Sequence, residues 1–438
     1  MNEEELLSKF VFYNPWWQQH QVPSILSPPF KRPIFAQLIH YLSLERIIIL
    51  KGPRRTGKST LMYQMIDQLI KTGTHPTTIL YLNFEDPLLR TSLFDLFSLF
   101  EKQLQEPLER TKPKYIFLDE IHLLPGWASS LKAFFDKKYP LKFICSGSAV
   151  SLIAKSSESL AGRTIEEIIY PFAFREWVNY HFIKKGQKEK IDATNYRLYK
   201  KQIDLEWEKY LVKGGFAHLL EIEDQILLQK LVHEDVVQKV IYKDLVDIYG
   251  IREPSVLEKV FYYLIRTSGG ILHLTDLGTT VGLNRETLRN YLSYLKQAFL
   301  YIELYKYSSS VKQTLSSAVK IHLVDPVFFA LTAEPKRSFI WETTIASYMY
   351  QKHSPHLFYW REREEVDLVW QNAGTLIPIE VKSGKNVMKK DLKGLFKCMD
   401  RFHIRDGWVL YAGEDKKETT GGRTIRFFNA AKYMYLAL

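Results

Sequence analysis

The chain has 438 residues, which is long enough for two to four domains that each bury a core of their own. Lysines and arginines number 60 against 49 aspartates and glutamates. The resulting net charge of +11 suits a polyanionic partner and, on charge alone, also a basic solvated surface. Only Cys145 and Cys398 are present, which excludes a disulfide framework and a thiolate metal site and fits a reducing compartment.

The N-terminal sequence MNEEELLSKF is acidic and lacks the basic start and apolar core of a signal peptide. No run of about 18 apolar residues occurs, so the sequence predicts neither a membrane span nor a membrane partner. We therefore expect a cytoplasmic protein.

Short apolar strands alternate with helical segments up to about residue 200. The strand candidates are residues 47–50, 78–84, 115–118 and 141–145, and helical patterns cover residues 93–104 and 127–136. This alternation predicts an α/β fold with a parallel sheet covered on both faces.

A complete phosphate-loop pattern, KGPRRTGKST at 51–60, stands between the first strand and the next helical pattern. Its two glycines let backbone amides curl around phosphate oxygens, and the helix that follows points its positive end at the same anion. Lys58 is predicted to reach the β- and γ-phosphates, Ser59 to ligate Mg²⁺, and Thr60 to support the α-phosphate or the helix start. The predicted nucleotide contacts are Gly52, Pro53, Arg54, Arg55, Thr56, Gly57, Lys58, Ser59 and Thr60.

Two acids end the strand at 115–118, about 60 residues further on. Parallel strands collect their ligands at their carboxyl ends, so this strand is predicted to neighbour the one before the glycine loop. Asp119 would then belong to the Mg²⁺ shell, and Glu120 could polarise the attacking water. A merely solvated loop is a poor explanation beside a complete phosphate loop.

Two further positions carry alternative interpretations. The strand at 141–145 runs into small hydroxyl residues, and Ser146 and Ser148 are candidates to sense the γ-phosphate, while plain turn chemistry explains them equally well. Arg163 could act as an arginine finger within the chain or across subunits, and an ordinary surface arginine is an equally good interpretation.

In this order the motifs resemble those of prokaryotic ATPases that have an AAA-like P-loop domain, a winged helix and a C-terminal restriction-endonuclease-like domain. The matching sequences are KGPRRTGKST, YLNFEDP, YIFLDEIH, SGSAVSL, LAGR, YPFAFREW and GGFA. The resemblance covers nearly the whole chain and implies an ATPase. Adenine over guanine is inferred from it alone, since the base-reading motif Asn-Lys-x-Asp is absent.

The predicted division has four parts: an ATPase domain at 1–200, a helical lid or linker at 201–266, a winged-helix domain at 267–335 and a nuclease-like domain at 336–438. The linker is almost purely helical, with one strand signal at 237–242. A homo-oligomer remains open.

A helix-turn-helix pattern covers residues 274–292, with wing strands near 301–307 and 320–324. Asn284 can cap the second helix, whose apolar face holds Leu288, Leu292 and Leu295. The open face is predicted to contact nucleic acid through Arg285, Arg289 and Asn290. A packing or protein–protein module explains the same pattern equally well.

The C-terminal part is predicted to hold a helix at 339–351, a β-hairpin at 366–382 and a closing strand at 407–411. A four-residue loop that pairs Trp370 with Thr375 would put Asp367 opposite Pro378, with the register uncertain by a residue. Alternation then places Asp367, Glu380 and Lys382 on one face.

This D…E-x-K face is what metal-dependent phosphodiester hydrolysis requires, because two carboxylates can hold Mg²⁺ or Mn²⁺ while a lysine orients water. The motif resembles that of the PD-(D/E)xK nuclease superfamily, in which a helical glutamate often completes the metal site, and Glu342 is the matching position. Five lysines follow closely and could bind a phosphate backbone, or they could form one solvated helix face: Lys385, Lys389, Lys390, Lys393 and Lys397.

The sequence as a whole favours an ATPase whose ATP cycle controls cleavage or engagement of nucleic acid, DNA rather than RNA. One alternative is an ATP-driven switch or scaffold with an inert nuclease-like domain. Another is a DNA-binding ATPase that remodels nucleic acid without cutting it.

Overall fold

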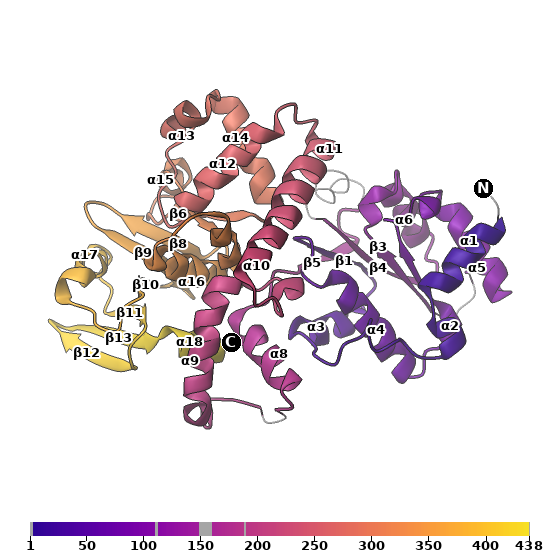
Figure 1. Cartoon of the computed structure of the whole chain (residues 1–438), viewed down its shortest axis with the longest axis horizontal. Helices are drawn as coiled ribbons and strands as arrows, with labels where there is room; N and C mark the ends of the chain where they lie inside the picture. Colours follow the sequence, from indigo (N-terminus) through magenta and orange to yellow (C-terminus); the bar gives the residue numbers. More distant parts are fainter. Residues whose placement is uncertain (1–2, 110–112, 149–159, 188–189, 438) are drawn as a thin grey trace. The chain divides into compact units, whose positions relative to one another are not determined.

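The computed structural model describes residues 3–109, 113–148, 160–187 and 190–437, and of Ser148 only the backbone (Figure 1). The chain divides into two compact units, Met1–Tyr170 and Pro171–Leu438. This division falls inside the predicted first domain, 1–200, and puts helix α8 (Phe174–Lys184) in the second unit. Among the helices described, none combines the length and the apolar character that a bilayer crossing needs.

The first unit is built on a five-stranded sheet in which every strand pairing is parallel, in the order β2-β3-β4-β1-β5. Its strands are β1 (Ile47–Gly52), β2 (Ile79–Asn83), β3 (Lys114–Asp119), β4 (Leu141–Ser148) and β5 (Thr164–Ile168). The predicted parallel α/β fold is confirmed. The predicted neighbour relation is wrong by one strand, because β4 lies between β1 and β3.

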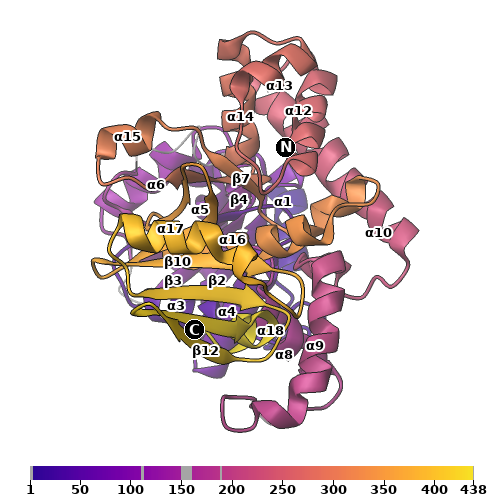
Figure 2. The same cartoon turned by 90° about the vertical axis from the view of Figure 1, so that its left-hand side faces the viewer.

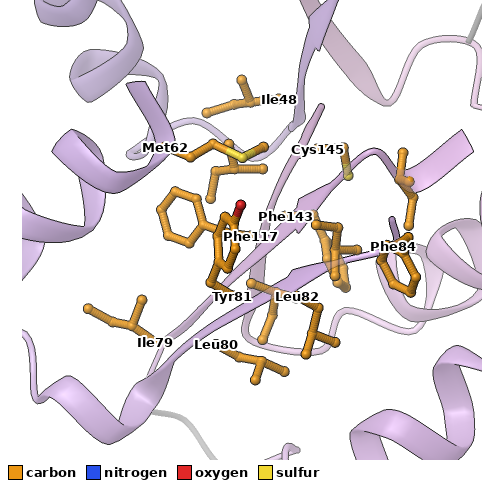
Figure 3. Packing of buried hydrophobic residues seen from close by; sticks show 14 of the residues in the cluster. Ile48, Met62, Ile79, Leu80, Tyr81, Leu82, Phe84, Phe117, Phe143 and Cys145 are labelled. Atoms are coloured by element: carbon orange, nitrogen blue, oxygen red, sulfur yellow. The ribbon is translucent and has the colours of Figure 1, made fainter. Parts of the chain in front are cut away.

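The helices of this unit are α1 (Glu3–Tyr13), α2 (Trp16–Gln19), α3 (Ile34–Tyr41), α4 (Lys58–Lys71), α5 (Leu93–Leu104) and α6 (Trp127–Asp136). Both predicted helices, 93–104 and 127–136, have the expected bounds. Rings of α5 and α6 pack on the same residue of β4, because the ring centroids of Phe97 and Phe134 lie 6.1 and 6.4 Å from that of Phe143. Phe143 lies in the buried core of this unit, together with Phe117 and Cys145 (Figure 3).

The edge strand β2 is closed by the N-terminal helices. Asn14 both donates to the carbonyl and accepts from the amide of Tyr81, and the indoles of Trp16 and Trp17 donate to the carbonyl of Ile79. Covering an edge in this way satisfies its backbone groups and leaves no free template for another strand.

The second unit begins with a series of helices. They are α8, α9 (Tyr196–Lys213), α10 (Gln225–Val232), the π-helical segment η5 (His233–Leu245), α11 (Val246–Tyr249), α12 (Pro254–Arg266), α13 (Leu274–Val281) and α14 (Arg285–Gln297). The strand signal at 237–242 is wrong, because this segment lies inside η5. Its apolar side chains Val236, Val237, Val240 and Ile241 recur with a helical period and are all buried.

A mixed eight-stranded sheet follows, in the order β12-β13-β11-β10-β9-β8-β6-β7. The strands are β6 (Tyr301–Lys306), β7 (Lys320–Leu323), β8 (Leu357–Arg361), β9 (Glu365–Asn372), β10 (Thr375–Lys382), β11 (Asp406–Tyr411), β12 (Lys416–Thr420) and β13 (Arg423–Asn429). The helices around it are α15 (Val311–Ser316), α16 (Arg337–His353), α17 (Lys393–Arg401) and α18 (Ala430–Leu436), with α17 lying across one face (Figure 2).

One expectation about this region needs correction. The strand at 407–411 is not the closing one, because β12 and β13 form a further hairpin after it. The sheet continues across the predicted boundary at 335, because the predicted wing strand β6 pairs with β8, Tyr305 against Phe358. The strands predicted for the wing and for the nuclease-like domain therefore belong to one sheet.

The predicted β9–β10 hairpin is present, but its loop has two residues instead of four. Ala373 and Gly374 both have positive φ, the conformation of a tight hairpin turn, and Thr375 pairs with Asn372. Trp370 consequently faces Ile377, and the ladder ends with Leu368 against Ile379. One step further along this register, Asp367 stands opposite Glu380 instead of Pro378.

Candidate functional site

The glycine loop joins β1 to α4 at the carboxyl edge of the parallel sheet. Gly52 and Gly57 have φ values of 148° and 91°, and α4 begins at Lys58. The Lys58 side chain is only 5% exposed, and its Nζ donates to the carbonyls of Gly52 at 3.2 Å and Pro53 at 2.8 Å. The Thr56 hydroxyl also donates to Pro53, at 3.1 Å. The loop thus encloses its own ammonium group beside the start of the helix.

A side chain at position 52 would force its surroundings to shift, because a Cβ there would lie 2.4 Å from the carbonyl oxygen of Ile169. We expect Gly52→Ala to lower the stability of the first unit by about 2 kcal/mol or more, from backbone strain and overpacking together. Thermal unfolding should be compared with Gly73→Ala, where φ is also positive but nothing lies within 4 Å of the added carbon. Equal losses in both variants would contradict the role of the Ile169 contact.

The carboxylate of Asp119, at the end of β3, is 1% exposed and held from two other strands. Its Oδ2 accepts a 2.6 Å hydrogen bond from the Tyr81 hydroxyl on β2, and its Oδ1 accepts from the Ser146 hydroxyl on β4. Ser146 Oγ in turn accepts from the backbone amide of Glu120 at 3.2 Å. Three neighbouring strands thereby fix the first acid of the predicted pair.

Glu120 follows in a left-handed conformation, with φ of 52°, which is uncommon outside glycine and marks a constrained position. Burial raises the pKa of its carboxyl group to about 7; Asp119 adds to the rise, whereas Lys58 and Arg54 oppose it. His122 Nδ1 lies 3.3 Å from Glu120 Oε2. A carboxylate with this pKa can accept a proton from water near neutral pH.

The sequence prediction missed several residues that support this site. Tyr81 holds Asp119, and Arg32 donates to the carbonyls of Thr56 at 3.1 Å and Tyr170 at 2.9 Å. Glu85 lies 3.9 Å from Arg54 of the loop. The motif YLNFEDP contains Tyr81 and Glu85 and was the available signal, but the β2–β3 register that brings it to Asp119 is a tertiary fact.

Arg163 lies at the amino ends of the parallel strands, whereas the glycine loop lies at their carboxyl ends. Its carbonyl accepts a 2.9 Å hydrogen bond from the amide of Ile47, the first residue of β1. Its guanidinium forms two hydrogen bonds with the carboxylate of Asp136. The structure therefore does not bring Arg163 to the glycine loop of its own chain. The side chain of Ser148, the second sensor candidate, lies outside the described residues.

A second group of charged side chains surrounds the β9–β10 hairpin. Asp367 Oδ2 accepts from the amide of Val381 at 2.8 Å, and Lys382 Nζ lies 2.6 Å from Glu380 Oε1. Glu380 is buried, and within the described part of the chain its Oε2 atom has no hydrogen-bond partner. The structure thus brings together the predicted D…E-x-K residues.

Glu342 enters the same group from α16, together with two residues that the sequence prediction missed. Lys320 Nζ lies 2.6 Å from Glu342 Oε1, 2.5 Å from Glu365 Oε1 and 3.5 Å from Asp367 Oδ1. The signal for Lys320 was a single lysine in the apolar strand KIHL. These six residues are called the acidic cluster: Glu342, Glu365, Asp367, Glu380, Lys320 and Lys382.

The acidic cluster contains more carboxyl groups than ammonium groups. Burial, and then the charge of Asp367, raises the pKa of Glu342 to about 8 and that of Glu380 well above its usual range, against the pull of Lys320 and Lys382. A divalent cation would displace the protons from these buried carboxyl groups, and oxygen donors suit Mg²⁺ or Mn²⁺. The residues present therefore fit a metal at Asp367 and Glu380.

Helix α14 has the features expected of it. The Asn284 side chain caps the helix by accepting from the amide of Thr287 at 2.9 Å. The predicted apolar face is buried: Leu288, Leu292 and Leu295. Arg285, Arg289 and Asn290 are all exposed, so the helix has a free polar face.

The glycine loop, its enclosed lysine and the acid pair at the end of β3 define a P-loop ATPase domain of the AAA type. In agreement, residues 44–178 match the family model described as an AAA domain. Residues 204–334 and 337–433 match two domains of unknown function, DUF8612 and DUF4143.

Several relatives align with this chain over most of their length. An uncharacterized protein of Haemophilus influenzae is 26% identical over 66% of this chain and 70% of its own. An uncharacterized protein of Methanocaldococcus jannaschii is 24% identical over 81% of this chain and 79% of its own.

Solved structures similar to this chain include AMPPCP-bound DnaA from Aquifex aeolicus, at 15% identity and a TM-score of 0.33, over 65% of this chain and 93% of DnaA. ORC1 of Aeropyrum pernix in complex with DNA has 13% identity and a TM-score of 0.29, over 70% of this chain and 95% of its own.

Proposed function

We propose that this protein hydrolyses ATP at the glycine loop and uses the ATP cycle to control how its second unit engages or cuts nucleic acid. One observation carries the ATPase part. Glu120, with a pKa near 7, stands beside Asp119, which hydrogen bonds from two neighbouring strands hold, and beside Lys58, which the glycine loop encloses.

Each residue has a distinct task in this proposal. Lys58 and the loop amides bind the β- and γ-phosphates, and Ser59 with Asp119 would hold Mg²⁺, which supplies charge neutralisation on the phosphates. Glu120 takes a proton from the attacking water. Ser146, which donates to Asp119, is in a position to sense the γ-phosphate through that carboxylate.

Nucleic-acid binding is proposed through the exposed face of α14, with Arg285, Arg289 and Asn290 as contacts and DNA preferred to RNA. Its support is the capped helix with a buried apolar face and the net charge of +11. Arg163 is proposed as an arginine finger only if it acts across subunits of a homo-oligomer.

Cleavage is proposed at the acidic cluster, where Asp367 and Glu380 would hold Mg²⁺ or Mn²⁺, which would activate water and offset phosphate charge. Glu342, the helical glutamate of the sequence prediction, pairs with Lys320. Lys382 orients water or the pentavalent phosphate. An inert cluster within an ATP-driven switch, or a DNA remodeller that does not cut, remain the alternatives.

One assay separates these functions. Purified protein should be incubated with single- and double-stranded DNA and RNA, with Mg²⁺ or Mn²⁺, with and without ATP. We expect cleavage of DNA that falls at least about 100-fold in Asp367→Ala and Lys382→Ala. Asp400→Ala, an exposed carboxylate of the same unit that pairs with Arg423, is the matched control and should keep full activity.

Tight binding of DNA without cleavage would instead support the remodelling ATPase, and neither binding nor cleavage would support the switch. Cleavage that persists in Asp367→Ala would contradict the assignment of the acidic cluster.

A further inference from the structure

Lys320 is a fully buried lysine on a strand of the predicted wing, outside the nuclease-like motif. Its Nζ atom contacts three carboxylates at 2.6, 2.5 and 3.5 Å, on Glu342, Glu365 and Asp367 respectively. Glu342 belongs to α16, and Glu365 and Asp367 belong to β9. The ammonium is therefore the meeting point of α16, β7 and β9.

The same three carboxylates have the arrangement of a metal site. One oxygen from each lies within 4.8 Å of the others, a spacing at which a single cation can reach all three. The contact with Glu365 is a charge-assisted hydrogen bond and the contact with Glu342 is a close ion pair, and both distances are only slightly longer than metal–oxygen bonds. The ammonium thus stands where a divalent ion would have to stand.

Packing holds these groups in place. A Cβ at Gly269 would lie 3.3 Å from Glu342 Oε2, and a Cβ at Gly394 would lie 1.9 Å from the carbonyl oxygen of Glu365. Lys320 itself is fixed in β7 by pairing with Leu304. The three carboxylates therefore stay close together whether the charge between them is an ammonium or a metal ion.

The other charged or titratable groups nearby do not replace this ammonium. Arg361 Nη1 lies 3.5 Å from the outer oxygen of Glu365. His322 Nε2 lies 3.9 Å from Glu342 Oε1, but burial and the charge of Lys320 hold the pKa of its imidazole well below the usual range, so the ring is neutral. Lys382 pairs with Glu380 at the other side of Asp367.

We propose that the Lys320 ammonium permanently occupies a divalent-cation position among Glu342, Glu365 and Asp367, so this part of the acidic cluster takes no metal. The wing strand thereby limits the cluster to one metal ion, at Asp367 and Glu380. Only that remaining metal rests on the proposed function; the exclusion by Lys320 stands independently of it.

Counting Mn²⁺ tests the proposal without reference to activity. The full chain, free of nucleotide, is titrated with Mn²⁺ by electron paramagnetic resonance, and Lys320→Met is compared with the natural protein. We expect the variant to bind one more Mn²⁺ per chain, and its thermal midpoint to rise with Mn²⁺ by more than that of the natural protein. Lys114→Met is the matched control, because Lys114 is equally buried but pairs with Glu106 of the first unit.

A variant that binds no more Mn²⁺ than the natural protein would overturn the proposal, and so would an equal gain in Lys114→Met. If the natural protein binds none and Lys320→Met binds one, the inference holds while the metal at Asp367 and Glu380 fails. If Lys320→Met does not fold, the double variant Lys320→Met/Glu342→Gln replaces it. This variant has one buried carboxylate charge fewer than Lys320→Met and keeps an oxygen ligand at position 342. The same gain of one Mn²⁺ per chain is expected.

Discussion

Replacing Lys58 by methionine is expected to abolish ATP hydrolysis, with a fall in kcat of about 100-fold to 1,000-fold, the usual effect of removing one charge that stabilises a transition state. Lys58 is the buried cation of the loop, held by the carbonyls of Gly52 and Pro53. Phosphate release from Mg²⁺–ATP, measured under saturating conditions, gives the rate directly.

Lys51→Met is the matched control for this variant. Lys51 stands seven residues earlier and pairs with Glu166 at 2.5 Å, so its loss removes the same charge from the same strand–loop segment without touching the glycine loop. A surface pair of this kind contributes little. Hydrolysis that is equally reduced in both variants, or retained in Lys58→Met, would contradict the role of Lys58.

Glu120→Gln should produce the second large effect, a fall in hydrolysis of about 100-fold to 10,000-fold with nucleotide binding retained. The amide keeps the size of the side chain but cannot accept a proton from water. Because the carboxyl group has a pKa of about 7 and acts in its deprotonated form, the natural rate should rise between pH 6 and pH 8, whereas the residual rate of the variant should not.

Glu109→Gln provides the comparison for Glu120→Gln. The carboxylate of Glu109 belongs to the same unit, is exposed and accepts a 2.6 Å hydrogen bond from the Tyr139 hydroxyl. The Glu109→Gln variant should hydrolyse ATP at close to the natural rate. A Glu120→Gln protein that retains the natural rate and pH profile would show that another group receives the proton.

Local patterns predicted much of this structure. The apolar runs before the glycine loop and before Asp119 became β1 and β3, because parallel strands that are covered on both faces need continuous apolar sequence. Helix α14 and its Asn284 cap follow from helical periodicity and capping chemistry. In the hairpin, residue alternation was enough to put Asp367, Glu380 and Lys382 together.

The remaining features depend on contacts between distant segments. Strand order decides that β4 separates β1 from β3, and no local pattern reports this order. The register of the β9–β10 hairpin depends on the positive φ of Ala373, which allows a two-residue loop. Lys320 joins the acidic cluster only because β6 and β7 extend the C-terminal sheet, and the position of Arg163 follows from the pairing of β5 with β1.

The most direct test of the central claim is calorimetric titration of the full chain with Mg²⁺ and β,γ-methylene ATP. Every other part of the account needs a triphosphate on the loop that starts at Gly52. One equivalent should bind to the natural protein, and the affinity should fall by at least about tenfold in Lys58→Met that remains folded by circular dichroism. Folded natural protein that takes up no nucleotide, or a variant that binds it equally well, would contradict the account.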